Sequence, residues 1–164
     1  MSEITTARLA LRPVTADEAT AVLAGQRRPD WAEDFPADGD RVIAGLLART
    51  GLPADDVARR FGHRLVVERD TGLVVGGAGF FGPPQDGEVE IGYGIVPSRQ
   101  RRGYATEAVQ AMVADVLQMD DVHTVTANVD LDNPASIRVL RKCGMTLCAQ
   151  DQQQATYHLR RPGQ

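Results

Sequence analysis

The amino-acid sequence predicts a mixed α+β fold in a single domain, and three observations support this prediction. Short strand-like segments joined by turn residues, at 64–68, 73–81 and 89–96, indicate three consecutive antiparallel strands. A long amphipathic segment separates the third of these from another β-rich run at 122–129, which predicts one parallel crossover. The length suits one domain, and no linker divides residues 1–164.

The N-terminal part alternates strand and helix signals. Residues 8–13 alternate polar and apolar side chains and are predicted as the first strand. A helix is expected at 15–25, with two acidic residues in its first turn, where the helix dipole favours them. Residues 27–40 form a loop rich in proline and acids, followed by helices predicted around 41–49 and 54–61.

The C-terminal part contains the longest predicted helix, 103–119. One stripe of this helix is apolar, which predicts packing on the sheet; it comprises Ala105, Ala108, Val109, Met112, Val116 and Met119. An Asp-Asn-Pro sequence at 132–134 supplies a cap and a first-turn proline for a shorter helix that ends at Gly144. Two more strands in 144–161 bring the expected sheet to six or seven strands.

Composition narrows the classes of function. The net charge of −4 disfavours a broad nucleic-acid surface, so no direct nucleic-acid partner is expected. The sequence has no secretory pattern and no membrane-length apolar run, which predicts a cytoplasmic location without membrane contact. Two cysteines and three scattered histidines form no metal constellation, so no metal is expected. A monomer and a homodimer are both compatible with the sequence.

The segment Gln100-Arg101-Arg102-Gly103-Tyr104-Ala105 has the properties of a phosphate-binding turn. Gly103 permits close backbone approach, a predicted helix N-terminus offers unpaired amides, and two arginines add positive charge. The Lys-Ser/Thr pair of a Walker loop and the three glycines of a dinucleotide-binding turn are missing. By itself, such a turn is more typical of a basic helix start in solvent, so the neighbouring motifs decide its interpretation.

Two neighbouring motifs favour phosphate binding. Asn133-Pro-Ala-Ser136 leads into Lys142-Cys-Gly-Met145, and Glu88-Val-Glu-Ile-Gly-Tyr-Gly-Ile-Val-Pro97 precedes the turn. With Gln-x-x-Gly-x-Ala at 100–105, these segments resemble the GNAT superfamily of N-acetyltransferases over residues 64–161. The residues Thr106-Glu-Ala108 and Ser136 resemble its RimJ/RimL-type branch.

The resemblance implies acetyl-coenzyme A as cosubstrate and a sheet whose two central parallel strands splay apart. The pyrophosphate is then expected at the turn, and the pantetheine arm between the splayed strands. The positions that carry over as cofactor-binding are Ile95, Pro97, Gln100, Arg101, Arg102, Gly103, Tyr104, Ala105, Thr106 and Asn133. Asn133 serves equally well as a helix cap, and the two roles are compatible.

Two residues are candidates for the acid–base chemistry. Glu90 is expected to accept the proton of the attacking amine, because it lies deeper in its strand than Glu88; a solvated strand face is the alternative. Many family members carry a tyrosine, as acid toward the thiolate, where this chain has Leu140. Ser136 is the replacement candidate, with a locally bonded helix hydroxyl as the alternative.

Trp31 and Phe35 are candidates for substrate binding, because their long loop is both acidic and aromatic; a role in the core is the alternative. The expected function is transfer of an acetyl group to a primary amine by direct attack on the thioester. The acceptor stays open between a protein N-terminus and a small-molecule amine such as a polyamine or an aminoglycoside. An inactive acetyl-coenzyme A sensor is the rival hypothesis, motivated by the missing tyrosine.

Overall fold

A computed structural model describes residues 3–163, within which eight strands form one sheet. The strands are β1 (Ile4–Thr5), β2 (Leu9–Pro13), β3 (His63–Glu68), β4 (Val74–Phe80), β5 (Glu88–Ile95), β6 (Thr124–Asp130), β7 (Thr146–Gln150) and β8 (Gln154–Arg160). The helices are α1 (Ala16–Ala24), α2 (Asp38–Thr50), α3 (Asp56–Arg60), α4 (Tyr104–Val116) and α5 (Pro134–Lys142), with a 3-10 turn η1 (Pro97–Arg99). No helix in the described range is long and apolar enough to cross a bilayer.

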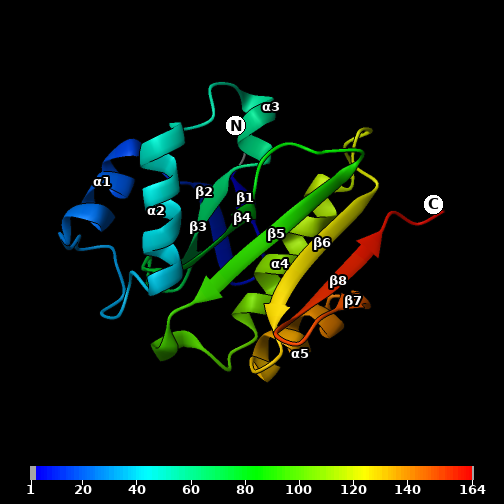
Figure 1. Ribbon diagram of the computed structural model, residues 1–164. Helices are drawn as coiled ribbons and strands as arrows, with labels where there is room; N and C mark the ends of the chain where they lie inside the picture. Colours follow the sequence, from blue (N-terminus) through cyan, green and yellow to red (C-terminus); the bar gives the residue numbers. More distant parts are fainter. Residues whose placement is uncertain (1–2, 164) are drawn as a thin grey trace.

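The sheet has the order β1-β2-β3-β4-β5-β6-β8-β7, and β5 with β6 is its parallel pair (Figure 1). The mixed, mostly antiparallel α+β fold predicted from the sequence is therefore confirmed. The expected number of six or seven strands was too low, because β1 precedes the first predicted strand. It has two residues, which pair as Ile4↔Leu11 and Thr5↔Ala10, and two residues are too few to show an alternating pattern.

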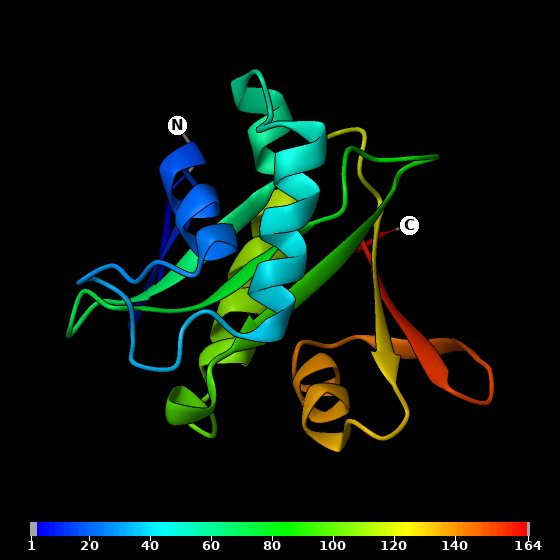
Figure 2. The same cartoon turned by 60° about the vertical axis from the view of Figure 1, so that its left-hand side comes forward.

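The helices cover the two faces of the sheet unequally. Figures 1 and 2 show α1 and α2 together on one face and α4 on the opposite face. In α4 the predicted apolar stripe is buried at its centre, at Ala108, Val109, Met112 and Val116. The helix ends at Val116, three residues before the expected Met119, where the chain turns toward β6.

α2 starts earlier than expected, at Asp38 instead of Arg41. Its N-cap is Ala37, whose side chain has no oxygen to bond the helix amides. Asp40 reaches back instead, and its Oδ2 accepts a hydrogen bond from the Ala37 amide at 3.0 Å. This contact places a carboxyl group, Asp40, on the inner side of the helix.

The parallel pair β5 and β6 separates along its length. The strands pair at Glu88↔Thr124, Val89↔Val125 and Glu90↔Thr126, after which β5 continues to Ile95 and β6 to Asp130 without pairing to each other. The predicted splay of the central strands is therefore present.

Candidate active site

The turn before α4 presents backbone amides without partners. Arg101 (φ 66°) and the N-cap Gly103 (φ 82°) adopt left-handed conformations, which aim the peptide groups outward. Within residues 3–163, no acceptor contacts the amides of Gly103, Tyr104 or Ala105. Unpaired amides at the positive end of a helix form an anion-binding site, and a diphosphate has the charge and size to bridge them.

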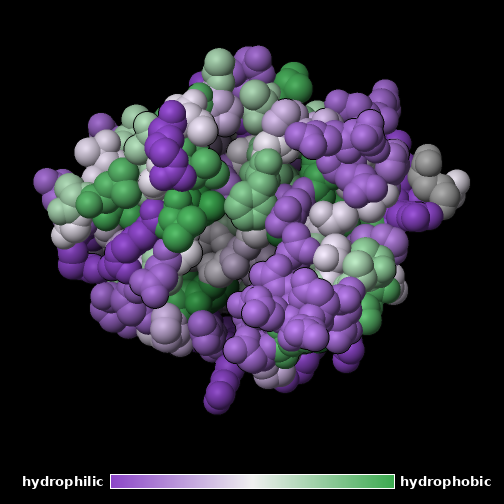
Figure 3. Space-filling view, in the orientation of Figure 1, coloured by the Kyte–Doolittle hydropathy of each residue, from purple (hydrophilic) through white to green (hydrophobic). Residues whose placement is uncertain are grey.

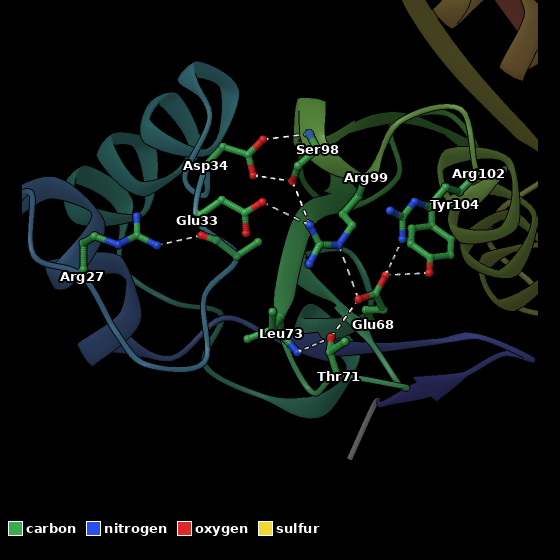
Figure 4. Close-up of polar contacts among 11 residues, drawn as sticks. Arg27, Glu33, Asp34, Glu68, Thr71, Leu73, Ser98, Arg99, Arg102 and Tyr104 are labelled. Atoms are coloured by element: carbon green, nitrogen blue, oxygen red, sulfur yellow. Dashed lines mark hydrogen bonds and ion pairs between the residues drawn. The ribbon is translucent and has the colours of Figure 1, made fainter.

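A buried carboxylate, Glu68 at the end of β3, holds this turn from below (Figure 4). Its Oε2 accepts a hydrogen bond from the Tyr104 hydroxyl at 2.7 Å and lies 3.5 Å from the Arg102 guanidinium. Its Oε1 lies 3.4 Å from Arg99 and accepts a bond from the Thr71 hydroxyl at 2.8 Å. Burial raises the pKa of Glu68, but these hydrogen bonds outweigh it and hold the pKa below its usual value. Glu68 therefore stays ionised and orients two arginines.

A second carboxylate, Glu107 in the first turn of α4, ties the turn to the N-terminal segment. Glu107 accepts bonds from the Arg8 guanidinium at 2.8 Å and from the Thr6 hydroxyl at 2.5 Å. The same guanidinium donates to the Arg102 carbonyl at 2.7 Å and lies over the Tyr104 ring. A side chain at Gly103 would place its Cβ 3.2 Å from Arg8 in a strained conformation, so the position favours glycine.

The structure brings the sequence-predicted cofactor residues to one end of the splayed strands. The Gln100 side chain donates to the Ile95 carbonyl at 2.8 Å, closing the turn on the end of β5, and Pro97 opens η1. The Thr106 carbonyl accepts a bond from Cys143, which links α4 to α5. The Tyr104 side chain is buried, so only its backbone faces outward.

On the other side of the gap, Asn133 caps α5 through a bond from the Ser136 amide at 3.2 Å. Helix capping is one of the two compatible roles that the sequence suggested for Asn133, the other being cofactor binding.

The gap between β5 and β6 contains a cavity of about 350 Å³. Glu90 and Tyr93 line it from β5, and Asn133 and Ser136 line it from α5. The Tyr93 hydroxyl lies 2.8 Å from Ser136 Oγ, so two hydroxyl groups meet across the gap. Burial raises the pKa of Tyr93, although the Ser136 bond acts in the opposite direction.

Leu140 is fully buried and is absent from the residues that line this cavity. Tyr93 was not singled out from the sequence as a functional residue, because its position on an apolar strand face gives no sign of Ser136, 43 residues away.

The peptide groups of Tyr93 and Ile95 face this gap. The Phe81 amide donates to the Glu90 carbonyl and the Val96 amide donates to the Val75 carbonyl, so even-numbered residues of β5 bond toward β4. Peptide groups alternate in direction along an antiparallel ladder, so those of the odd-numbered residues point the other way. β6 no longer pairs at that level, which leaves the Tyr93 and Ile95 amides free to donate to a ligand.

A second cavity, of about 380 Å³, lies between the α1–α2 layer and strands β3 to β5. Trp31 and Phe35 line it and are also part of the core, because the two residues are only 4% and 1% exposed. Their rings are in edge contact, with centroids 5.1 Å apart. Phe81, Gly92 and Tyr93 line both cavities, so the two spaces adjoin at β5.

The acidic residues Glu33 and Asp34 of the loop do not line this second cavity. Asp34 accepts bonds from the Ser98 amide and hydroxyl at 2.8 and 2.7 Å, and Glu33 pairs with Arg99 at 3.4 Å. These acids fasten the loop to η1 (Figure 4), which explains their presence without an acceptor. Glu33 and Asp34 are thus engaged by residues of this chain.

Sequence reasoning also missed Glu68, whose partners Arg99, Arg102 and Tyr104 lie more than 30 residues away, and Asp40, whose carboxylate faces a cavity that only the packing of α2 on the sheet creates. A usable signal was present for the second cavity: glycines alternate at Gly77 and Gly79 in one strand and at Gly92 and Gly94 in the next. Such a period of two leaves one sheet face without side chains. Within residues 3–163, no cluster of three or more histidine, cysteine or acidic side chains is arranged to hold a metal.

The acetyltransferase (GNAT) domain family matches residues 8–146, and the chain belongs to this family. Among curated relatives it is 36% identical to the uncharacterized N-acetyltransferase YjdG of Bacillus subtilis over 58% of each chain, so the match spans less than two thirds of YjdG. It is 30% identical to the uncharacterized N-acetyltransferase YoaA of the same organism, over 85% of this chain and 80% of YoaA.

Among solved structures, the same fold occurs in RimL, a ribosomal L7/L12 α-N-protein acetyltransferase in complex with coenzyme A. The TM-score is 0.68 at 20% identity, with 97% of this chain and 98% of RimL covered. At this identity the likeness concerns the fold alone.

Proposed function

We propose that this protein transfers the acetyl group of acetyl-coenzyme A to a primary amine. The observation that carries the proposal is the set of unpaired amides at the start of α4, beside two arginines and at the mouth of the gap between β5 and β6. This arrangement suits a diphosphate whose attached arm enters the gap. A protein of the same fold, RimL, is known in complex with coenzyme A, which supports this choice of ligand. Acetyl-coenzyme A would supply an acetyl group already activated as a thioester.

Within the gap, this chain's residues are placed for direct transfer. Glu90 lines the space and accepts the proton that the attacking amine must lose. The Tyr93 and Ile95 amides donate to the acetyl oxygen as it gains negative charge. Ser136, held by the Tyr93 hydroxyl, donates a proton to the departing sulfur.

The Tyr93 and Ser136 hydroxyl groups line the gap, whereas Leu140 does not, and they support an active enzyme over an inactive sensor. A thiolate also needs less protonation than an alkoxide to depart, because a thiol has a pKa near 8.5.

We further propose that the enzyme resembles the RimJ/RimL branch in its chemistry toward the amine. Ser136 at the start of α5 and the fold shared with RimL support this assignment. An α-amine, with a pKa near 8, also loses its proton more readily than a lysine side chain near 10.4, which suits a single glutamate base.

The test is a screen of amines, with free coenzyme A as the readout and EDTA present. We expect coenzyme A release that depends on the amine and is unaffected by the chelator, because amides and arginines supply the positive charge. Calorimetry with acetyl-coenzyme A alone gives the independent readout. Absence of binding at millimolar ligand would overturn the proposal, and binding without release for any amine would restore the sensor hypothesis.

A further inference from the structure

The cavity between α2 and the sheet has a floor made by glycines. Gly77 pairs with Gly94 across β4 and β5, and both line the cavity together with Gly92, two residues before Gly94. Residues two apart share one face of a strand, and this face is turned toward α2. A Cβ atom at Gly94 would meet no atom within 4 Å, so the space above it is open. The hollow therefore exists because side chains are missing from two adjacent strands.

The walls of this cavity are mainly apolar. They include Val22, Trp31, Phe35, Ile43, Leu47 and Leu65. Apolar side chains also gather over α1 and α2 on the left of Figure 3, whereas hydrophilic ones dominate over α5. A cavity of about 380 Å³ with such walls is of the size and character that holds a small apolar group.

Few charges face the cavity, and one carboxyl oxygen there lacks a donor. Glu18 is engaged by the Arg12 guanidinium at 2.7 Å, and Arg64 adds a positive charge to the lining. Asp40 uses Oδ2 on the Ala37 amide. Its Oδ1 lies 2.9 Å from where a Cβ on Gly77 would be, and within residues 3–163 no donor bonds it. The cavity thus offers one acceptor for a hydrogen bond in apolar surroundings.

Resting on the proposed function, we propose that this cavity binds the body of the acceptor, which is a primary amine on an apolar stem of aromatic or branched aliphatic character. The stem lies on the glycine floor, and Asp40 Oδ1 accepts a hydrogen bond from a donor group on it. Because Phe81, Gly92 and Tyr93 border both cavities, the amine reaches the gap while the stem stays in the hollow. An extended polycation fits poorly, because Arg64 lies in the lining and Glu18 is already paired.

The experiment fills the cavity from two opposite walls. Gly94→Leu projects from the sheet and Gly39→Leu from the start of α2, and both positions line the cavity with open space at the Cβ. Gly45→Leu on α2 is the matched control, because it lies outside the lining and a Cβ there would meet only the end of the Arg49 side chain, at 3.9 Å. The probes are phenethylamine, isoamylamine, a short peptide with N-terminal phenylalanine, and spermidine.

We expect the apolar amines to have the lowest KM, and both cavity variants to raise that KM at least about tenfold, with the affinity for acetyl-coenzyme A unchanged. The small amines and the peptide distinguish a free amine from a protein terminus. A lower KM for spermidine than for the apolar amines, or an unchanged KM in both cavity variants, would overturn the inference while leaving acetyl transfer intact.

If no amine is acetylated, the proposed function fails by itself. NMR titration of phenethylamine into the original protein and into the Gly94→Leu variant then tests the cavity inference separately. Binding that the variant abolishes supports an apolar site, and absence of binding to the unmodified protein overturns it.

Discussion

Individual residues at this site have properties set by burial and by one or two partners. Asp40 and His63 line the same apolar cavity and respond to it in opposite ways, because burial disfavours the charged form of each. Burial raises the pKa of Asp40 to about 6 against the bond from the Ala37 amide, and it lowers the pKa of His63 to about 4. Near neutral pH the carboxylate of Asp40 is therefore ionised, which costs folding stability, and the imidazole of His63 is uncharged.

Replacing Asp40 by asparagine should stabilise the protein at neutral pH. The pKa of Asp40 is about 6 in the folded chain against an ordinary 3.8, so the folded state loses stability as the pH rises through this window. The introduced carboxamide would keep an oxygen that accepts the bond from the Ala37 amide. We expect Asp40→Asn to gain about 1–3 kcal/mol in free energy of unfolding at pH 7.5, and the gain to vanish near pH 4.

Urea unfolding of both proteins across this pH range measures the difference, in which the opposite contribution of His63 cancels. Asp38→Asn, fully exposed in the same helical turn, is the control and should lack this dependence. A constant difference between Asp40→Asn and the original chain at all pH values would contradict the burial argument.

Replacing Glu90 by glutamine should lower turnover without weakening acetyl-coenzyme A binding. Glu90 lines the gap, and glutamine has the same shape but no longer takes a proton. We expect Glu90→Gln to lower kcat about a hundredfold or more at pH 7, and the loss to shrink at high pH as the free amine becomes abundant.

The pH profile of kcat for both proteins, together with calorimetric Kd values, tests the role of Glu90. Glu88→Gln, on the same face of the strand but exposed, is the matched control. Full activity of Glu90→Gln near neutral pH would show that Glu90 is structural.

At the scale of elements, the start of α4 acts as a unit with β3 and the N-terminal segment. Glu68 and Glu107 hold the turn from two sides, each through several hydrogen bonds. The turn is thus fixed before a ligand arrives, which lowers the entropic cost of binding. The exposed side chain of Arg102 is tethered only at 3.5 Å to Glu68, so it is able to turn toward a phosphate.

Arg102→Ala should therefore weaken acetyl-coenzyme A binding in a salt-dependent manner. We expect Kd to rise about tenfold at low salt, the effect of one charge-assisted hydrogen bond, and to approach the original value at high salt, where charges are screened. Calorimetry at several salt concentrations measures this, with the exposed Arg49→Ala on α2 as control. An equal loss at every salt concentration would indicate a packing role for Arg102 instead.

At the scale of the molecule, the sequence predicted what is local and missed what is distant. The turn at 100–105 depends on neighbouring residues, and the crossover from β5 to β6 follows from the strand and helix patterns of consecutive segments; both are present. The contacts of Tyr104 with Glu68 and of Tyr93 with Ser136 span 36 and 43 residues, so no short pattern reveals them. The glycine floor of the second cavity lies between these two cases. The alternation of its glycines is visible in the sequence, but the cavity that it creates depends on the position of α2.

The sheet also separates the two halves of the proposed reaction, with the acceptor cavity on the α2 face and the proposed phosphate-binding site at the start of α4. This division predicts that damage to the acceptor side leaves the cofactor side intact. Trp31 is the sharpest probe, because it lines the cavity while its backbone pairs with Val74 at the start of β4.

Trp31→Ala should lower the free energy of unfolding by about 3–5 kcal/mol, the cost of removing a buried aromatic side chain. It should also raise the KM for the amine, because the cavity loses part of its wall, while the Kd for acetyl-coenzyme A stays constant under conditions where circular dichroism shows the fold intact. Trp31→Phe, which keeps an aromatic wall, should show smaller effects of both kinds. A matching rise in the Kd for acetyl-coenzyme A would contradict the separation, because the loop would then transmit the loss to η1 through the bonds between Asp34 and Ser98.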